Sequence, residues 1–320
     1  MNYAEFSYAN PEHPPLKRWT IRAIEGVSGR RKLVDLYQVW KHTMVGTSDY
    51  IWNDLLGLIN LNVSVADGEW PPKDLPQGPL VLIANHPYGI GDGLAILALA
   101  EKLNRPFKIL INNELLKVPE VRPFSLPVDF EETKEALKTN MQTRREALRL
   151  LQEGTTIIVF PGGGVATAAK PFGRAEELPW KTFTAKMIRS SKATVLPLYF
   201  HGQNSWLFHL VSKYSLTLRL SLLVREFRRI LGSVITARAG SPIPFETLSG
   251  LGDQKEIMDF LQTRLWKWHR RIVAVVCLAD IPDQDAVIYT AGCDRAHHHQ
   301  AILSSISCCW FAGLQARLRT

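Results

Sequence analysis

A histidine and an aspartate in one glycine-rich segment, residues 85–93, are the side chains of this chain best suited to acid–base chemistry. The segment follows the apolar run 79–84, which predicts a buried strand, and leads into an apolar run that predicts a helix capped by Asp92. His86 and Asp92 would then lie together at the carboxyl end of a strand, where open α/β sheets hold their reactive groups. A carboxylate beside an imidazole fixes its tautomer and stabilises the imidazolium, so the pair predicts a general base. The alternative is a buried histidine that only stabilises a turn.

A proline and three successive glycines form a second turn after the strand predicted over 155–160: Pro161, Gly162, Gly163 and Gly164. Backbone N–H groups in such a turn can approach an anion closely. Lys170 and Arg174 follow, and both suit phosphate or carboxylate recognition. The Lys-Ser/Thr pair of a Walker A loop is missing. A plain glycine turn with solvated cations beyond it is the simpler interpretation.

Strands and helices are predicted to alternate along the middle of the chain. The predicted strands cover 79–84, 107–111, 155–160 and 194–200. The predicted helices cover 92–103, 131–153 and 180–191. This alternation predicts an α/β fold with a mostly parallel central sheet flanked by helices. A chain of 320 residues is long enough for one such domain of about 250 residues plus appendages.

The segments on either side of this region differ from it in composition. Residues 1–30 predict an irregular arm, and residues 32–60 predict one or two amphipathic helices with a break at 46–48. Their Trp and Tyr residues favour a membrane interface, but helices that merely cover the sheet would look the same. We therefore expect an N-terminal part over 1–74 and the α/β domain over 75–270.

Residues 271–320 form an atypical tail. All four cysteines lie in it, the last lysine precedes it, and its three adjacent histidines have no zinc-ligand spacing. We expect no metal site there, and we hypothesise that the tail lies outside the fold core. Upstream, residues 206–231 alternate apolar and basic side chains. They predict either a segment that binds the headgroup region of a membrane or a helix or strand packed on the core with a solvated charged side.

The net charge of +8 calls for an anionic partner. No basic recognition motif or aromatic platform for nucleic acid stands out, which leaves an anionic membrane surface. The start of the chain does not read as a signal peptide, and no run of about 18 apolar residues occurs, so a peripheral cytoplasmic protein fits best. A dinucleotide-binding oxidoreductase is disfavoured because Leu94 stands where the third glycine of that fingerprint belongs.

The motifs and their order resemble the glycerolipid and lysophospholipid acyltransferases, in particular a bacterial hemolysin-like branch that includes lyso-ornithine lipid acyltransferases. The family signature separates His and Asp by four residues, whereas five intervene here, as in the branch pattern His-Pro-x-Gly-x-x-Asp-Gly. Residues 160–163 match Phe-Pro-x-Gly, the beginning of the branch pattern Phe-Pro-x-Gly-Gly, but Gly162 replaces the family glutamate. Arg122 and the strand end 195–198 match two further blocks, and the resemblance covers roughly residues 75–240.

The resemblance implies a glycerol-3-phosphate acyltransferase-like fold and an O-acyltransferase of membrane lipid synthesis. His86 would take the proton of an acceptor hydroxyl, and Asp92 would orient the imidazole. The expected substrate contacts are Asn85, Gly91, Arg122, Pro161, Gly162, Gly163, Gly164, Lys170 and Arg174. The glycines would hold either the oxyanion or an acceptor phosphate.

The donor implied by the resemblance is a thioester of acyl-carrier protein or coenzyme A, with no bound cofactor. The acceptor would be a lysophospholipid or a lyso-aminolipid, and the missing glutamate favours one other than lysophosphatidic acid. The enzyme would work at the cytoplasmic face of an anionic membrane. The alternative is a non-catalytic membrane-binding protein with a degenerate acyltransferase fold.

Overall fold

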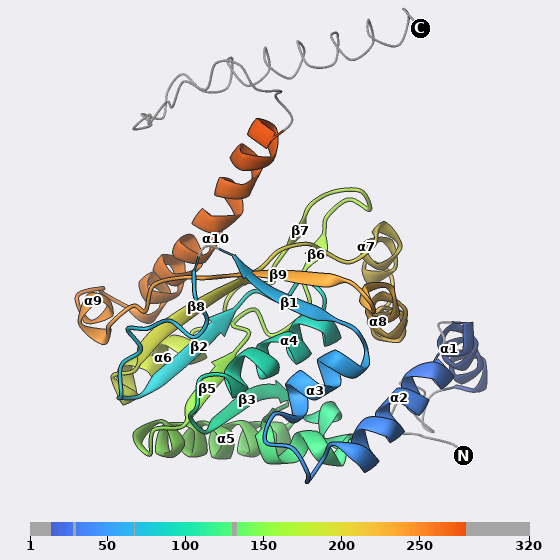
Figure 1. The fold of residues 1–320 in the computed structure, drawn as a ribbon, viewed down its shortest axis with the longest axis horizontal. Helices are drawn as coiled ribbons and strands as arrows, with labels where there is room; N and C mark the ends of the chain where they lie inside the picture. The colour runs from blue at the N-terminus through green and yellow to red at the C-terminus, as the bar shows by residue number, and fades with distance from the viewer. Residues whose placement is uncertain (1–13, 28–29, 67, 130–132, 280–320) are drawn as a thin grey trace, which may run out of the picture. The chain divides into compact units, whose positions relative to one another are not determined.

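The computed structural model describes residues 14–27, 30–66, 68–129 and 133–279 (Figure 1). The chain divides into two compact units, Met1–Ala274 and Val275–Thr320. The central sheet and the candidate site both lie in the first unit. Most of the second unit falls outside the described residues, as does the predicted tail from residue 280 onward.

A seven-stranded sheet forms the centre of the first unit, with the strand order β1-β9-β8-β2-β5-β3-β4. Its strands are β1 (Asn62–Ala66), β2 (Leu80–Ala84), β3 (Phe107–Asn112), β4 (Ser125–Val128), β5 (Thr156–Val159), β8 (Thr194–Phe200) and β9 (Val234–Ala239). Five adjacent strands run parallel to one another: β8, β2, β5, β3 and β4. Strand β9 is antiparallel to β8, and β1 is parallel to β9. The short strands β6 (Thr167–Ala168) and β7 (Ala175–Glu176) form a separate hairpin.

Helices cover both faces of the sheet. One face packs against α2 (Arg30–Thr43), α3 (Ile51–Leu58), α4 (Ile90–Glu101) and α8 (Leu216–Ile230). The other packs against α5 (Lys134–Gln152), α6 (Phe183–Ser191), α9 (Phe245–Ser249) and the first part of α10 (Gln254–Ala279). The chain also contains α1 (Pro15–Val27), α7 (Trp206–Ser212) and two 3₁₀ helices, η2 (Asn113–Lys117) and η3 (Pro119–Phe124).

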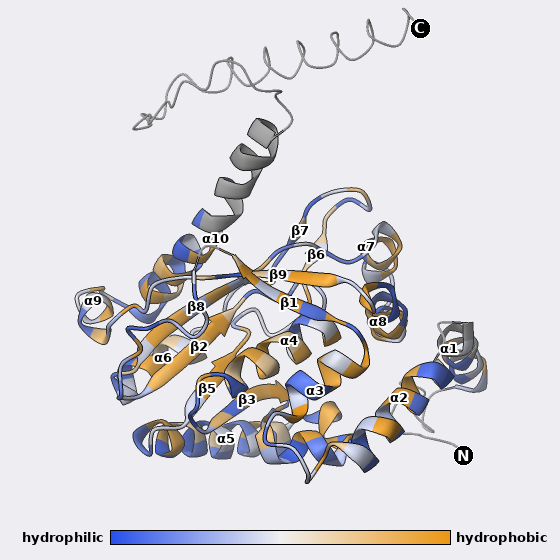
Figure 2. Cartoon of the chain, viewed as in Figure 1, coloured by the Kyte–Doolittle hydropathy of each residue, from blue (hydrophilic) through white to orange (hydrophobic). Residues whose placement is uncertain are grey.

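The composition of β2 explains its central position. All five of its residues are buried, because Leu80, Leu82 and Ala84 face one helical layer while Val81 and Ile83 face the other. A strand covered on both sides reads as a continuous apolar run, whereas the helices around it need apolar side chains on one face only. Figure 2 shows this difference, with largely hydrophobic central strands and helices of mixed hydropathy.

The structure confirms the α/β class, the mostly parallel sheet, and all the strands and helices predicted between residues 79 and 200, with shifts of a few residues at their ends. The two helices expected over 32–60 are α2 and α3. The predicted boundary at residue 74 separates β1 from the sheet to which it belongs, since β1 pairs with β9. The boundary at residue 270 falls inside α10.

Two other expectations need correction. The irregular arm expected over 1–30 is wrong for residues 15–27, which form α1, a helix that packs against α8 and buries Ile21. Residues 1–13 lie outside the described residues. Segment 206–231 is not one helix but two, α7 and α8, each capped by a serine hydroxyl, Ser205 and Ser215. No helix within the described residues combines the length and apolar character needed to cross a bilayer.

Candidate active site

His86 and Asp92 meet at the carboxyl end of β2. His86 Nδ1 lies 3.0 Å from Asp92 Oδ1, and the aspartate side chain is fully buried while 18% of the histidine side chain remains exposed. The other aspartate oxygen, Oδ2, accepts a hydrogen bond from the Tyr88 N–H at 2.9 Å. The carboxylate therefore sits between the imidazole and the turn that precedes α4.

The helix begins earlier than expected, and this shift brings Asp92 back to His86. We expected Asp92 to cap the helix, but α4 begins at Ile90 and Asp92 lies in its first turn, where a carboxylate also favours the positive end of the helix dipole. Gly89 supplies the turn with a φ of +84°, a conformation that side chains disfavour. The extra residue between His86 and Asp92 is thus taken up by the turn.

The second glycine-rich motif packs directly against the histidine. The Phe160 ring stacks on the His86 ring, with 4.1 Å between centroids and 24° between planes. Gly163 turns the chain with a φ of +68°, and its N–H donates to the Phe160 carbonyl at 2.9 Å. The Ala166 N–H donates to the His86 carbonyl at 2.8 Å, so the two predicted motifs form one unit.

A glutamate that no motif contained completes this unit. Glu177 Oε1 accepts a hydrogen bond from the His86 N–H at 3.0 Å, and Oε2 accepts one from Trp180 Nε1 at 2.8 Å. Burial raises the pKa of the Glu177 carboxyl from 4.5 to about 7, against the opposing effect of these hydrogen bonds. Sequence reasoning missed this residue because it is one of two adjacent glutamates just past a short hairpin.

Two of the residues predicted to bind substrate serve the fold. Asn85 is buried, and its side chain accepts from the Phe200 N–H at 2.6 Å and donates to the Phe200 carbonyl at 2.8 Å, which ties β2 to β8. A Cβ atom at Gly91 would lie 2.2 Å from Ile230 Cδ1, so the missing side chain there allows α4 to approach α8. A substrate contact stays a prediction for both residues, and these contacts favour a structural role.

The three predicted cations lie in different places. Arg122 in η3 is exposed, and its Nε donates to the Leu116 carbonyl at 2.7 Å. Lys170 is exposed in the loop between β6 and β7. Arg174 stacks over the Trp266 ring at 5.1 Å and hydrogen-bonds to Tyr199, a residue at the carboxyl end of β8. Of the three, Arg174 has contacts that place it at the same sheet edge as His86.

An apolar cavity of about 180 Å³ adjoins the helix that carries Asp92. It is lined by Leu33, Leu36, Tyr37, Trp40, Trp52, Leu55, Ile59, Ile90, Leu94, Val118, Val121, Val224 and Phe227, which come from α2, α3, α4, α8 and the η2–η3 region. An apolar cavity of roughly 150 Å³ already stays dry and accepts hydrocarbon. This space is therefore suited to an alkyl chain.

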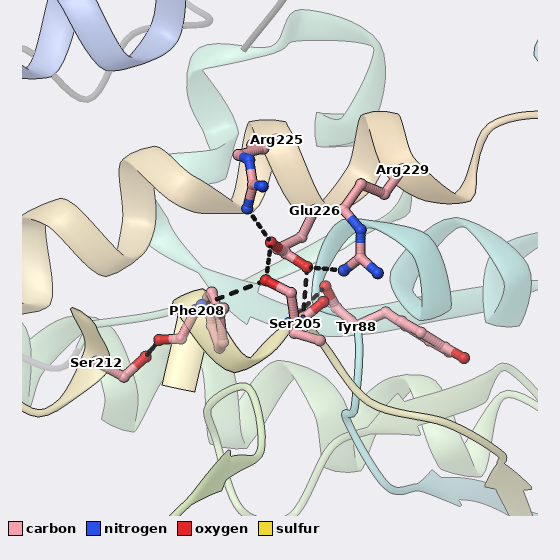
Figure 3. A network of polar contacts seen from close by, with 8 residues as sticks. Tyr88, Ser205, Phe208, Ser212, Arg225, Glu226 and Arg229 are labelled. Carbon is pink, nitrogen blue, oxygen red and sulfur yellow. Dashed lines mark hydrogen bonds and ion pairs between the residues drawn. The ribbon is translucent and has the colours of Figure 1, made fainter. Parts of the chain in front are cut away.

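A buried ion-pair network joins α8 to the loop after β8 (Figure 3). Glu226 is almost fully buried and accepts from Ser205 N and Oγ, at 2.8 and 2.6 Å. It also pairs with Arg225 at 3.2 Å and Arg229 at 2.7 Å. Two of the basic residues of segment 206–231 thus neutralise a carboxylate within the fold, and the apolar side of α8 packs in the core, which favours the packed interpretation of this segment.

The part of the chain that the structure describes contains no group of three His, Cys, Asp or Glu side chains arranged to hold a metal ion. The predicted absence of zinc spacing around residues 293–299 concerns residues outside that part.

Comparison with known proteins points to one family. Residues 70–201 match the model of the Acyltransferase family. Two lyso-glycine lipid O-acyltransferases, from Phocaeicola vulgatus and Bacteroides thetaiotaomicron, are 26% and 27% identical over 208 and 188 residues. These matches cover 61% and 55% of this chain, and 70% and 65% of the two relatives.

The solved structure of the 1-acyl-sn-glycerophosphate (LPA) acyltransferase of Thermotoga maritima aligns over 72% of this chain and 77% of its own, with a TM-score of 0.43 and 16% identity. Similarity this low assigns neither fold nor function. The motif order, the joining of both motifs at one sheet edge and the family match agree with one another. Residues 70–201 therefore carry an Acyltransferase domain, and the chain is a lipid O-acyltransferase similar to the lyso-glycine lipid O-acyltransferases.

Proposed function

We propose that this enzyme moves a fatty acyl group from an acyl-carrier protein or coenzyme A thioester to the hydroxyl of a lyso-aminolipid. The observation that carries the proposal is the 3.0 Å contact between His86 and Asp92 at the carboxyl end of β2. The relatives' names, which specify lyso-glycine lipid, support an acceptor of the lyso-aminolipid class. The glycine at position 162 agrees with an acceptor other than lysophosphatidic acid.

In this mechanism His86 acts as the general base. Its Nδ1 faces Asp92, so Nε2 takes the proton of the acceptor hydroxyl as the oxygen attacks the thioester carbonyl. The tetrahedral intermediate collapses with cleavage of the carbon–sulfur bond, and the imidazolium returns the proton to the departing thiolate. The products are the ester and the free thiol, and no covalent acyl-enzyme is formed.

The oxyanion of the intermediate needs hydrogen-bond donors. The Gly163 N–H already donates to the Phe160 carbonyl, which leaves the N–H groups of Gly162 and Gly164 as the candidates in this turn. One preorganised donor of this kind contributes roughly 10²–10³ in rate. Binding of an acceptor phosphate or carboxylate by the same groups is the other use of the turn.

The acyl chain would occupy the apolar cavity. Ile90 and Leu94 lie one turn apart on α4 and line the cavity, whereas Asp92, two residues from each, lies on the opposite face of the helix and contacts His86. The same helix therefore positions both the base and the wall of the alkyl site.

We also propose that the enzyme works peripherally at the cytoplasmic face of an anionic membrane, where both substrates are accessible. Helix α1 exposes Leu16 and Trp19, and the β6–β7 loop exposes Phe172, 83% of which is accessible. Phe172 stacks on Trp206 with 5.4 Å between centroids, and Lys170 is exposed in the same loop. Aromatic side chains next to cations suit the headgroup region of a bilayer.

Acyl transfer by the purified protein tests the proposal. Wild type, His86→Ala and Asp92→Asn would receive labelled acyl-carrier protein or acyl-coenzyme A with a panel of lyso-lipids, in which lyso-aminolipids should be the best acceptors. We expect turnover to fall by about 10²–10⁴ in His86→Ala and by less in Asp92→Asn, which keeps the shape of the aspartate. His42→Ala, which alters an exposed histidine of α2, is the matched control.

Two outcomes contradict the proposal. Near-normal transfer by His86→Ala would show that the base is another group. A wild type that transfers no acyl group but still binds vesicles would favour the non-catalytic membrane-binding alternative.

A further inference from the structure

Both carboxylate oxygens of Glu177 accept hydrogen bonds, and one of these bonds comes from the catalytic histidine. Oε1 accepts from the His86 N–H and Oε2 from the Trp180 indole N–H, at 3.0 and 2.8 Å. These two donors come from segments about 90 residues apart, and neither is part of a helix or strand ladder. The carboxylate is therefore a fixed part of the site rather than a surface charge.

The glycine at position 162 makes room for this arrangement. A Cβ atom there would lie 3.1 Å from the Leu178 carbonyl oxygen and 3.8 Å from Glu177 Cβ. The backbone of residues 177–178 thus occupies the space above the turn that a side chain at position 162 would enter. The motif of the resembling enzymes carries its glutamate at this position, whereas here a carboxylate reaches the site from the neighbouring segment.

The ionisable groups around Glu177 come from three parts of the fold. His86 and Asp92 belong to the turn between β2 and α4, and the charge of the imidazole favours ionised Glu177 while that of Asp92 opposes it. Tyr199 of β8 lies on the other side, with Arg174 beside it. Burial raises the pKa of Tyr199 to about 12, so this phenol stays neutral near pH 7. Glu177 is therefore a group of this set whose own charge changes near neutrality.

We propose that Glu177 is a positioning residue for His86, which fixes the histidine backbone and adds a second carboxylate beside Asp92 to stabilise the imidazolium formed during acyl transfer. The inference rests on the proposed function, because that function assigns the proton to His86. Proton transfer from the acceptor creates a cation at His86, and an ionised Glu177 favours that cation. A protonated Glu177 still fills the site but withdraws this support.

Activity should therefore depend on the ionisation of Glu177. As the pH falls through about 7, Glu177 takes up a proton, and kcat/KM should fall with it. The stability of the protein should depend on pH in the opposite direction to kcat/KM. The native carboxyl holds its proton up to about pH 7 and the unfolded one only to 4.5, so the free energy of unfolding falls as the pH rises through this window.

The test compares pH profiles of kcat/KM and of thermal unfolding for four proteins: wild type, Glu177→Gln, Trp180→Phe and Glu176→Gln. Glu177→Gln should lower the plateau of kcat/KM by about tenfold, a part of the ~10²–10⁴ that the base supplies. Its acid limb should move to lower pH, because the variant lacks the carboxyl group whose protonation near pH 7 lowers kcat/KM. The decline of stability between about pH 5 and 7 should be absent from this variant.

Trp180→Phe should move the acid limb in the opposite direction. The indole N–H lowers the pKa of Glu177, so its removal keeps the carboxyl protonated to higher pH. Glu176→Gln removes the same charge from an exposed neighbour and should leave both profiles unchanged. If Glu177 had only a structural role, Glu177→Gln and Trp180→Phe would not shift the acid limb of the kcat/KM profile in opposite directions.

The outcomes separate the inference from the proposed function. One result is that wild-type protein shows His86-dependent transfer while the acid limbs of the Glu177→Gln and Trp180→Phe profiles coincide with its own. That result overturns the role of Glu177 and leaves the proposed function standing. A wild type without His86-dependent transfer overturns both. The stability profile needs no substrate, and a Glu177→Gln profile that retains the wild-type decline between pH 5 and 7 also contradicts the assignment.

Discussion

Replacement of Glu226 by glutamine should destabilise the protein by about 2–4 kcal/mol. Its side chain is 1% exposed and accepts two hydrogen bonds from Ser205, while Arg225 and Arg229 are 41% and 51% exposed. A glutamine oxygen can replace one acceptor, so the variant loses about one hydrogen bond to a charged group, roughly 1.5–3 kcal/mol. The half-exposed arginines can turn to water, and their pairs add only about 0.5–1 kcal/mol in total.

Urea unfolding at constant pH, with thermal unfolding beside it, measures this loss. A change of 2–4 kcal/mol corresponds to about 4–15 °C in Tm for a domain of this size. Glu246→Gln on α9 removes an exposed carboxylate and should stay within about 0.5 kcal/mol of wild type. If Glu226→Gln matches that control, the network of Figure 3 is not a stabilising element and Arg225 and Arg229 are free to serve a membrane.

Two further predictions concern substrate and membrane. Leu94→Phe should narrow the apolar cavity and shift the preference of the enzyme toward shorter acyl chains. Competition among acyl donors of graded chain length measures this preference, with Leu137→Phe on the exposed side of α5 as the control. If both variants rank the donors as wild type does, the acyl chain binds elsewhere. Phe172→Ser should weaken sedimentation with anionic vesicles without loss of stability, because the ring is exposed; binding equal to that of a Leu137→Ser control would remove this loop from the membrane contact.

The network also changes which residues test membrane binding. Arg225, Arg228 and Arg229 lie close together in the basic segment 206–231. In the structure Arg225 and Arg229 pair with Glu226, so their removal would disturb α8 and its connection to Ser205. Arg228 is exposed, and Phe172 with Trp206 offers a surface that can be altered without breaking a buried contact.

The sequence by itself determined the class of fold and the central pair of the site. β2 and α4 were predictable because both are buried on all sides, so each reads as a continuous apolar run. His86, Asp92 and the Pro161–Gly164 turn were predictable because each follows a strand, and parallel strands end at the same sheet edge. β4 and η3 were harder to predict, since prolines at 119, 123 and 127 interrupt the pattern there.

Only the tertiary structure decided which distant residues surround that pair. Glu177 reaches His86 across 91 positions, and Phe160 stacks on it across 74, because β5 and β8 lie on either side of β2. The cavity draws its walls from helices at both ends of the first unit. The apolar periodicity of a segment shows whether a side chain is buried, but it does not show which other segment covers that side chain. The surroundings of the catalytic histidine depend on the strand order, which no local sequence pattern encodes.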